Sequence, residues 1–326
     1  MTQATNLPTA RPAARRLTLG AFVIVVVLGG FASALQARAN GELAHHSGNG
    51  VLAALINFSF GFLLISVAVI ASPRLRRALA SIGPAIRDGR LPWWALTAGF
   101  LGGAFIACQS YATALIGVSL FSVAMVSGQS VNSLIVDRVG LGPVGRLAIS
   151  GRRVLAAAIA VIAVLVANLG ALHGTPIVLS AVLVALLGGA LVAVQQAFNG
   201  RVNSSVGQPL ATAWTSFLAG TLGLGIGVAT LALAADTGMH LPSDGPWWMY
   251  AGGALGVCFV ATTAWAVPRY GVLTVALIVI AGQLMMALAL DLLAPIGSAH
   301  VTLWLTLGVV LTFVAVGTGA WTRSRR

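Results

Sequence analysis

Long apolar runs separated by short polar segments fill the chain from residue 17 to its end. An α-helix needs about 20 residues to cross the hydrocarbon core of a bilayer, and each run is long enough to do so. The pattern predicts an all-α integral membrane protein with about ten transmembrane helices. The predicted spans are residues 17–37, 50–71, 92–115, 117–136, 153–172, 176–198, 209–235, 247–267, 271–292 and 301–321.

The first run also has features of a cleaved signal peptide, because a basic segment precedes it and the small residues Ala32-Ser33-Ala34 lie near its end. The sixth run carries the same motif in the middle of the chain, where no signal peptide can lie. We therefore expect the first run to be retained as a helix. Residues 1–16 are polar and hold three arginines, which predicts a cytoplasmic tail.

Composition agrees with a lipid environment. The chain is 58% hydrophobic and only 7% charged, whereas a soluble domain is about 25% charged. The net charge of +12 comes from 18 arginines in the segments between apolar runs, so we expect the lipid bilayer as a partner and no nucleic acid. We find no Cys/His cluster with zinc spacing, no phosphate loop and no nucleophile–base pair, and we expect no metal, no cofactor and no enzymatic activity.

The arginines also predict the orientation. If the N-terminus is cytoplasmic and ten spans alternate, 17 of the 18 arginines lie on the cytoplasmic side and only Arg38 lies outside. Four of the six acidic residues and all five histidines lie on the outer side. The positive-inside rule thus predicts that both termini face the cytoplasm of a bacterial-type inner membrane.

Two copies of one pattern follow each other along the chain. Gly29-Gly30-x5-Gln36-x3-Asn40-Gly41 returns 159 residues later as Gly188-Gly189-x5-Gln195-x3-Asn199-Gly200. Further on the offset is 154 residues, and the matched residues are Pro92-Trp93-Trp94 with Pro246-Trp247-Trp248, Gly102 with Gly256, Phe105 with Phe259, Gly128-Gln129 with Gly282-Gln283, and Asp137 with Asp291.

The repeat predicts two units, residues 17–173 and 174–326, the second ending in a basic cytoplasmic C-terminus. Each unit holds five spans, an odd number, so the second unit must enter the membrane in the inverted orientation. Inverted repeats commonly place a transporter's substrate site near mid-bilayer, where the repeats meet. The fused units suggest a monomer or a weak homodimer.

The GG-x5-Q-x3-N-G segment, the Pro-Trp-Trp start of the third span and the Gly-Gln…Asp pattern of the fourth resemble the YdcZ-like family of the drug/metabolite transporter superfamily. The resemblance covers nearly the whole chain past residue 17, once in each half. It implies an inner-membrane exporter without naming a substrate. The superfamily's small multidrug resistance branch uses a Glu in the first helix, and here that helix holds Gln36 and Asn40, which disfavours proton-coupled antiport by that mechanism.

Polar side chains within spans are the candidate site residues, because they must face the bundle interior or a cavity. Gln36 and Asn40 are four residues apart and share a helix face, and Gln195 and Asn199 repeat them. They could line a substrate pathway, or they could hold helices together by hydrogen bonds. The further pathway candidates are Gln129, Gln283, Gln109, Tyr111 and Trp265.

Asp137 and Asp291 close the fourth and ninth spans and are weak candidates for a coupling site. A solvated helix end, paired with Arg138 in the case of Asp137, explains them equally. No charged residue lies near a span centre, which favours neutral or zwitterionic cargo. The histidines are expected to be solvated loop residues, with a metal or pH-sensing role for His45-His46 as the alternative.

The sequence thus predicts a secondary transporter, in the direction of export, for a small organic metabolite or drug-like compound. The transporter would alternate access at a mid-membrane site between the halves. Two alternatives stay open, a non-transporting scaffold or subunit of an envelope complex and a flippase for a lipid-linked substrate. A transporter needs a cavity lined by the amides, whereas a scaffold would bury them in direct helix contacts.

Overall fold

The computed structural model describes residues 19–169, 176–234, 238–293 and 302–320, and within those ranges the chain is helical with no strand, as predicted. The predicted tail (residues 1–16), the boundary between residues 173 and 174, and the basic C-terminus lie outside the described residues. The helices are α1 Leu19–Ser47, α2 Gly50–Ala71, α3 Pro73–Ala80, α4 Ile82–Arg87, α5 Ala98–Val139, α6 Gly151–Leu169, α7 Pro176–Val206, α8 Pro209–Ala234, α9 Gly252–Tyr270, α10 Val272–Leu293 and α11 Leu303–Ala320, with 3₁₀ turns η1 Trp93–Thr97 and η2 Trp247–Ala251.

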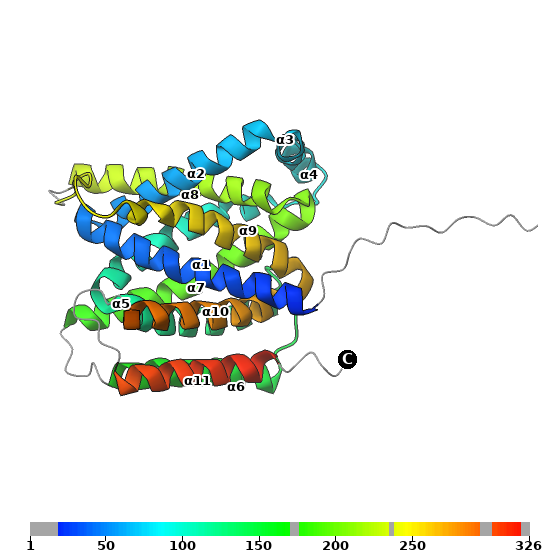
Figure 1. The fold of residues 1–326 in the computed structure, drawn as a ribbon. Coiled ribbons are helices and arrows are strands. Elements are labelled where there is room, and N and C mark those ends of the chain that lie inside the picture. The colour runs from blue at the N-terminus through cyan, green and yellow to red at the C-terminus, as the bar shows by residue number, and fades with distance from the viewer. Residues whose placement is uncertain (1–18, 170–175, 235–237, 294–301, 321–326) are drawn as a thin grey trace, which may run out of the picture.

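The long helices lie side by side in one bundle (Figure 1). Seven of the described helices are long and apolar enough to cross a membrane, namely α1, α2, α5, α7, α8, α9 and α10. Helices α6 and α11, which cover most of the predicted fifth and tenth spans, pack against each other at one side of the bundle (Figure 1). The protein is therefore a multi-pass membrane protein, while ten crossings and two cytoplasmic termini stay predictions.

Two predicted spans belong to one helix, α5, which has 42 residues. A straight helix of that length would reach about 60 Å, twice the thickness of the hydrocarbon core. Gly117 breaks it, with a φ of 75° that favours glycine. The two arms fold back on each other, so that the beginning and the end of α5 lie close together. Arg201 shows this, since it stacks on Trp94, just before α5, and bonds the carbonyl oxygen of Leu141, just after it.

The matched helices α1 and α7 run in opposite directions. The end of α9 contacts the beginning of α1, where the rings of Tyr270 and Phe22 lie 4.2 Å apart. The same end of α9 lies at the end of α7, where Gly200 faces Val267. Helix α1 therefore begins where α7 ends.

Contacts between the halves are reciprocal. Gly30 of α1 packs against the backbone of α10 at Val279 and Gln283, and its match Gly189 packs against α5 at the matched Met125 and Gln129. In the same way Gly99 faces Ser216 and Gly220, whereas Gly253 faces Asn57 and Gly61. On the boundary the matched rings of Phe58 and Phe217 stack, 4.7 Å apart and 27° from parallel. A pseudo-twofold axis therefore passes between these two rings.

The two ends of the bundle differ in chemistry. At one, which we name the arginine end, lie Arg90, Arg153, Arg201 and Arg269. At the other, the histidine end, lie Glu42, His45, His46, His240 and Asp244. By the positive-inside rule the arginine end is predicted to face the cytoplasm.

Candidate functional site

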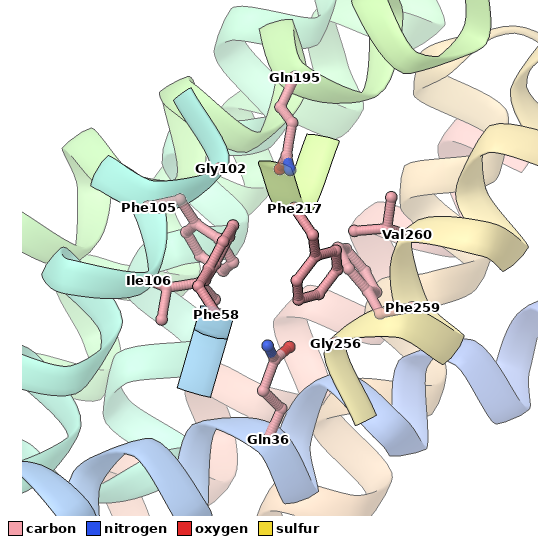
Figure 2. A pocket seen from close by; sticks show the side chains of 10 residues that line it. All are labelled: Gln36, Phe58, Gly102, Phe105, Ile106, Gln195, Phe217, Gly256, Phe259 and Val260. Atoms are coloured by element: carbon pink, nitrogen blue, oxygen red, sulfur yellow. The ribbon is translucent and has the colours of Figure 1, made fainter. Parts of the chain in front are cut away.

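A small cavity lined by buried residues lies on the pseudo-twofold axis between the halves (Figure 2). Its volume is about 10 Å³, which is room for about one water. The lining comes from α1, α2, α5, α7, α8 and α9. The residues are Gln36, Phe58, Gly102, Phe105, Ile106, Gln195, Phe217, Gly256, Phe259 and Val260.

These ten residues form five matched pairs of the internal repeat. Gln36 with Gln195 and Phe58 with Phe217 follow the offset of 159, and the other three pairs follow the offset of 154. Four of the five pairs are identical, and the fifth pairs Ile106 with Val260. The cavity is therefore nearly the same when viewed from either half.

The two glutamines lie at opposite ends of the cavity with the phenyl rings between them (Figure 2). Each side chain is only 3% exposed, and in the described part of the chain neither amide has a hydrogen-bond partner in the protein. The Gln36 Oε1 atom is fully buried in this state. Such a buried, unpaired amide costs free energy, about 1–3 kcal/mol, which a bound water or solute can recover.

Glycines make room for these amides. A Cβ at Gly102 would overlap the Nε2 atom of Gln195, and a Cβ at Gly256 would overlap that of Gln36. Each glutamine therefore rests against a glycine of the other half. Any larger residue at either position would displace the amide from the cavity.

One turn along α1 from Gln36, three amides form a chain of hydrogen bonds. Asn57 Nδ2 donates to Asn40 Oδ1, and Asn40 Nδ2 donates to Gln109 Oε1 at 2.6 Å. These residues come from α2, α1 and α5, so the chain joins three helices. They lie outside the cavity lining.

The matched positions in the second half are Asn199, Ser216 and Thr263, all buried. Thr263 bonds the carbonyl oxygens of Phe259 and Val260 in its own helix. Within the described residues the Asn199 Oδ1 and Ser216 Oγ atoms have no partner. The amide chain is therefore a feature of the first half alone.

Gln129 and Gln283 make contacts between helices and do not line the cavity. Gln129 Nε2 donates to Gln196 Oε1 at 3.2 Å, which joins α5 to α7. Gln283 Nε2 donates to Ser122 Oγ at 3.1 Å and Gln283 Oε1 accepts from Ser33 Oγ at 3.4 Å, so α10 is joined to α5 and α1.

The aromatic candidates Tyr111 and Trp265 also lie away from the cavity. The Tyr111 side chain is exposed, with its hydroxyl 3.3 Å from that of Ser180. Trp265 packs against Phe22 and carries the guanidinium of Arg269, 4.5 Å from the ring centre. The Tyr111 hydroxyl and the Trp265 ring thus contact neighbouring helices and not the cavity.

Asp137 and Asp291 are buried but already engaged. Asp137 pairs with Arg153 of α6, where the sequence had suggested Arg138. Asp291 accepts a hydrogen bond at 2.8 Å from the backbone N–H of Ser119, two residues past the break at Gly117. A carboxylate at this position stabilises the start of the second arm of α5.

The sequence analysis did not place the phenylalanines in a site. Phe58, Phe105, Phe217 and Phe259 belong to an apolar majority in which aromatic residues usually serve packing. The signal that could have found them is the repeat itself, since Phe58 and Phe217 share the offset of 159 with the glutamines and Phe105 and Phe259 share the offset of 154 with Gly102 and Gly256. Two matched residues lie close to each other only where both are near the pseudo-twofold axis.

The bundle of apolar helices and its two antiparallel halves define the class of an α-helical membrane protein with internal repeats. Two segments of the chain, residues 21–166 and 180–318, match the family described as "Putative inner membrane exporter, YdcZ". Together they cover most of the chain, and the protein belongs to this family. It is a multi-pass inner-membrane protein of the exporter class, and its two segments correspond to the two copies of the repeat.

No curated protein matches the chain. Among solved structures, one described as "Crystal structure of protein" has a TM-score of 0.55 and 15% sequence identity, over 91% of this chain and 94% of that one. At this level of identity the similarity concerns the fold alone.

Proposed function

We propose that the protein is a secondary exporter that moves a small organic solute by alternating access at the cavity on the axis. The observation that carries the proposal is the composition of the lining, five matched pairs from two antiparallel halves. Exchange of conformation between such halves opens the same cavity first to one end and then to the other. All ten lining residues are buried, and in the proposed cycle this conformation is an intermediate between the two openings.

Both ends of the bundle hold contacts that such a cycle would break in turn. At the histidine end His46 of α1 contacts Asp244, which lies before η2. At the arginine end the matched pair is Ser205 of α7 and Arg90, which lies before η1, with Ser205 Oγ donating to the Arg90 carbonyl oxygen at 3.2 Å. We name these the two gate contacts.

The test uses a cysteine in the cavity and needs no known substrate. In a Cys108→Ala/Cys258→Ala background, Ile106→Cys is labelled with a membrane-impermeant maleimide from either side of oriented vesicles. We expect labelling from both sides. A disulfide between His46→Cys and Asp244→Cys should abolish labelling from the histidine end alone, and one between Ser205→Cys and Arg90→Cys should abolish it from the arginine end alone.

Ala163→Cys, buried between α6 and α11 and away from the cavity, is the matched control and should stay unlabelled. If Ile106→Cys reacts from neither side, Gln36 and Gln195 serve helix packing, and the result favours the alternative of a non-transporting scaffold. If it reacts from both sides with either gate locked, the cavity is an open pore and alternating access is wrong.

A further inference from the structure

The chemistry of the cavity defines a class of cargo, and this inference rests on the proposed function. No charged residue is among the ten that line the cavity. The matched carboxylates Asp137 and Asp291 do not line the cavity either; Asp137 pairs with Arg153, and Asp291 Oδ2 accepts from the Ser119 N–H. A full charge brought into this space would lose its hydration without gaining a counter-charge, at a cost of several kcal/mol. Uncharged cargo avoids that cost.

The positions of the polar groups restrict the cargo further. Gln36 and Gln195 are the polar side chains of the lining and lie at its two opposite ends (Figure 2). Each amide offers a donor and an acceptor, and the Gln36 Oε1 atom is buried without a partner. A solute that satisfies both amides needs a hydrogen-bonding group at each of two ends.

The walls between the amides are aromatic. Phe58 and Phe217 stack across the axis, and Phe105 and Phe259 flank them (Figure 2). Because the cavity has room for about one water, cargo must displace this stack. A flat ring can replace the lost ring–ring contact by stacking on the same faces.

We propose that the cargo is a small, uncharged, flat solute with a hydrogen-bonding group at each of two opposite ends. The probes are four benzene derivatives that differ only in these groups. Benzene-1,4-dicarboxamide has both polar ends, benzamide has one, benzene-1,4-dicarboxylate carries two negative charges, and benzene-1,4-diamidine carries two positive charges.

The measurement is the apparent melting temperature of the purified protein at increasing concentrations of each probe, followed by uptake into proteoliposomes. We expect the dicarboxamide to stabilise the protein at the lowest concentration, benzamide to need at least tenfold more, and both charged probes to have no effect. Gln36→Leu and Gln195→Leu should each weaken dicarboxamide binding by ten- to a hundredfold, and by similar factors. Tyr111→Phe, which alters a polar group outside the cavity, should leave binding unchanged.

Tighter binding of a charged probe, or equal binding of benzamide and the dicarboxamide, would overturn the proposed class. So would the absence of binding by all four probes in a protein whose Ile106→Cys still shows alternating access. In each case the labelling result upholds transport while the cargo class fails. Failure of the labelling experiment itself would remove the proposed function first.

The gate contact at the histidine end carries a second, independent inference. His46 lies between two carboxylates, with Nε2 at 3.4 Å from Glu42 and Nδ1 at 3.1 Å from Asp244. The other titratable or charged groups around it are His45, whose ring meets it edge-on, Arg38 on the same helix, His240 and Tyr250 on the segment opposite, and Asp291 at the end of α10. The matched gate contact, Ser205 with the Arg90 carbonyl, has no titratable atom.

We infer that protonation of His46 holds the gate at the histidine end closed. A protonated imidazole attracts both carboxylates, whereas a neutral one can only share hydrogen bonds with them. The contact is therefore stronger while the imidazole is protonated than while it is neutral. The gate at the arginine end has no such dependence.

The test measures the rate of Ile106→Cys labelling from each end between about pH 5 and 8, the range in which histidines titrate in general. Each rate is divided by the labelling rate of the same variant in denaturant at that pH, which removes the pH dependence of the thiol itself. From the histidine end, we expect the rate to fall severalfold as pH decreases. His46→Gln should abolish this dependence, and His45→Gln should keep it. The inference would be overturned if the labelling rate from the histidine end had the same pH dependence in His46→Gln, or no pH dependence with His46 in place.

Discussion

The cavity and the two ends of the bundle differ in how far the halves resemble each other. In the cavity the halves present the same glutamine, the same two phenylalanines and the same glycine. At the ends the same repeat offsets pair Glu42 with Arg201, His46 with Ser205, and Asp244 with Arg90. A central site that serves both directions needs one chemistry from both halves. Each end meets a single compartment and is free to differ.

The amide chain lies between these extremes. Asn40 and Asn199 are identical, but their partners differ, since Asn57 and Gln109 are matched by Ser216 and Thr263. The two halves are thus less alike in the amide chain than in the cavity. Four predictions test this difference, from the largest expected effect to the smallest.

Gly30→Ala and Gly189→Ala should both destabilise the protein strongly and equally. A Cβ at either position would overlap a backbone carbonyl, of Val279 or of Met125, which cannot move aside without shifting a helix. Overpacking of this kind costs about 1–3 kcal/mol or more. The measurement is the yield and apparent melting temperature in detergent. Gly225→Ala is the control, because nothing lies within 4 Å of a Cβ there. Unequal losses of stability would show that the contact between α1 and α10 and the contact between α7 and α5 are not equivalent.

Asn40→Ala should lower stability more than Asn199→Ala. The first change leaves the Asn57 donor and the Gln109 acceptor unpaired, at about 1–3 kcal/mol each, whereas the second removes an amide whose oxygen is already unpaired. We expect a difference of about 2 kcal/mol in the free energy of unfolding. In the double variant, Asn57→Ala should add little to Asn40→Ala, because the same bond is already lost. Equal losses at residues 40 and 199 would contradict the asymmetry.

Arg201→Gln should cost more than Glu42→Gln at pH 7. The Arg201 guanidinium bonds the carbonyl oxygens of Gly140 and Leu141, both at 2.6 Å, and lies over the Trp94 ring. Its loss should cost about 1.5–3 kcal/mol. Glu42 makes one longer contact with His46, and its change should cost about 0.5 kcal/mol. Arg201→Lys should rescue stability only in part, because an ammonium lacks the planar fork.

Asp88→Asn should change stability least. Its pair with Arg90 at the arginine end is 58% exposed on both sides, and such pairs contribute about 0–1 kcal/mol. We expect a change within about 0.5 kcal/mol in the same thermal assay. A larger loss would mean that the arginine end depends on its exposed charges and not only on Arg201.

The sequence predicted the helices because apolar runs of span length are the strongest signal a membrane chain carries. It predicted the approximate limits of α2 and α8 within a few residues, but it placed the end of α1 near residue 37, although the helix continues to Ser47. The polar residues from Asn40 to Ser47 made that segment resemble a loop. Their polarity is tolerated because Asn40 and Ser47 are fully buried with partners in the protein.

Among the site residues, the repeat drew attention to Gln36 and Gln195, and these do line the cavity. Gln129 and Gln283 belong to the same matched pattern but bond to neighbouring helices. Both pairs are glutamines at matched positions of the repeat, so the sequence could not tell the pair that lines the cavity from the pair that bonds neighbouring helices. The distinction depends on distance from the axis, which only the packing of α1, α5, α7 and α9 determines.

The near-identity of the two walls has a pharmacological consequence. A molecule that has a twofold axis of its own can align that axis with the axis between Phe58 and Phe217 and present the same group to Gln36 and to Gln195. Each favourable interaction with one half is then repeated with the other, so every improvement in a symmetric inhibitor counts twice. In the proposed cycle, such a compound that is too large to pass either gate would hold the protein midway between its two openings.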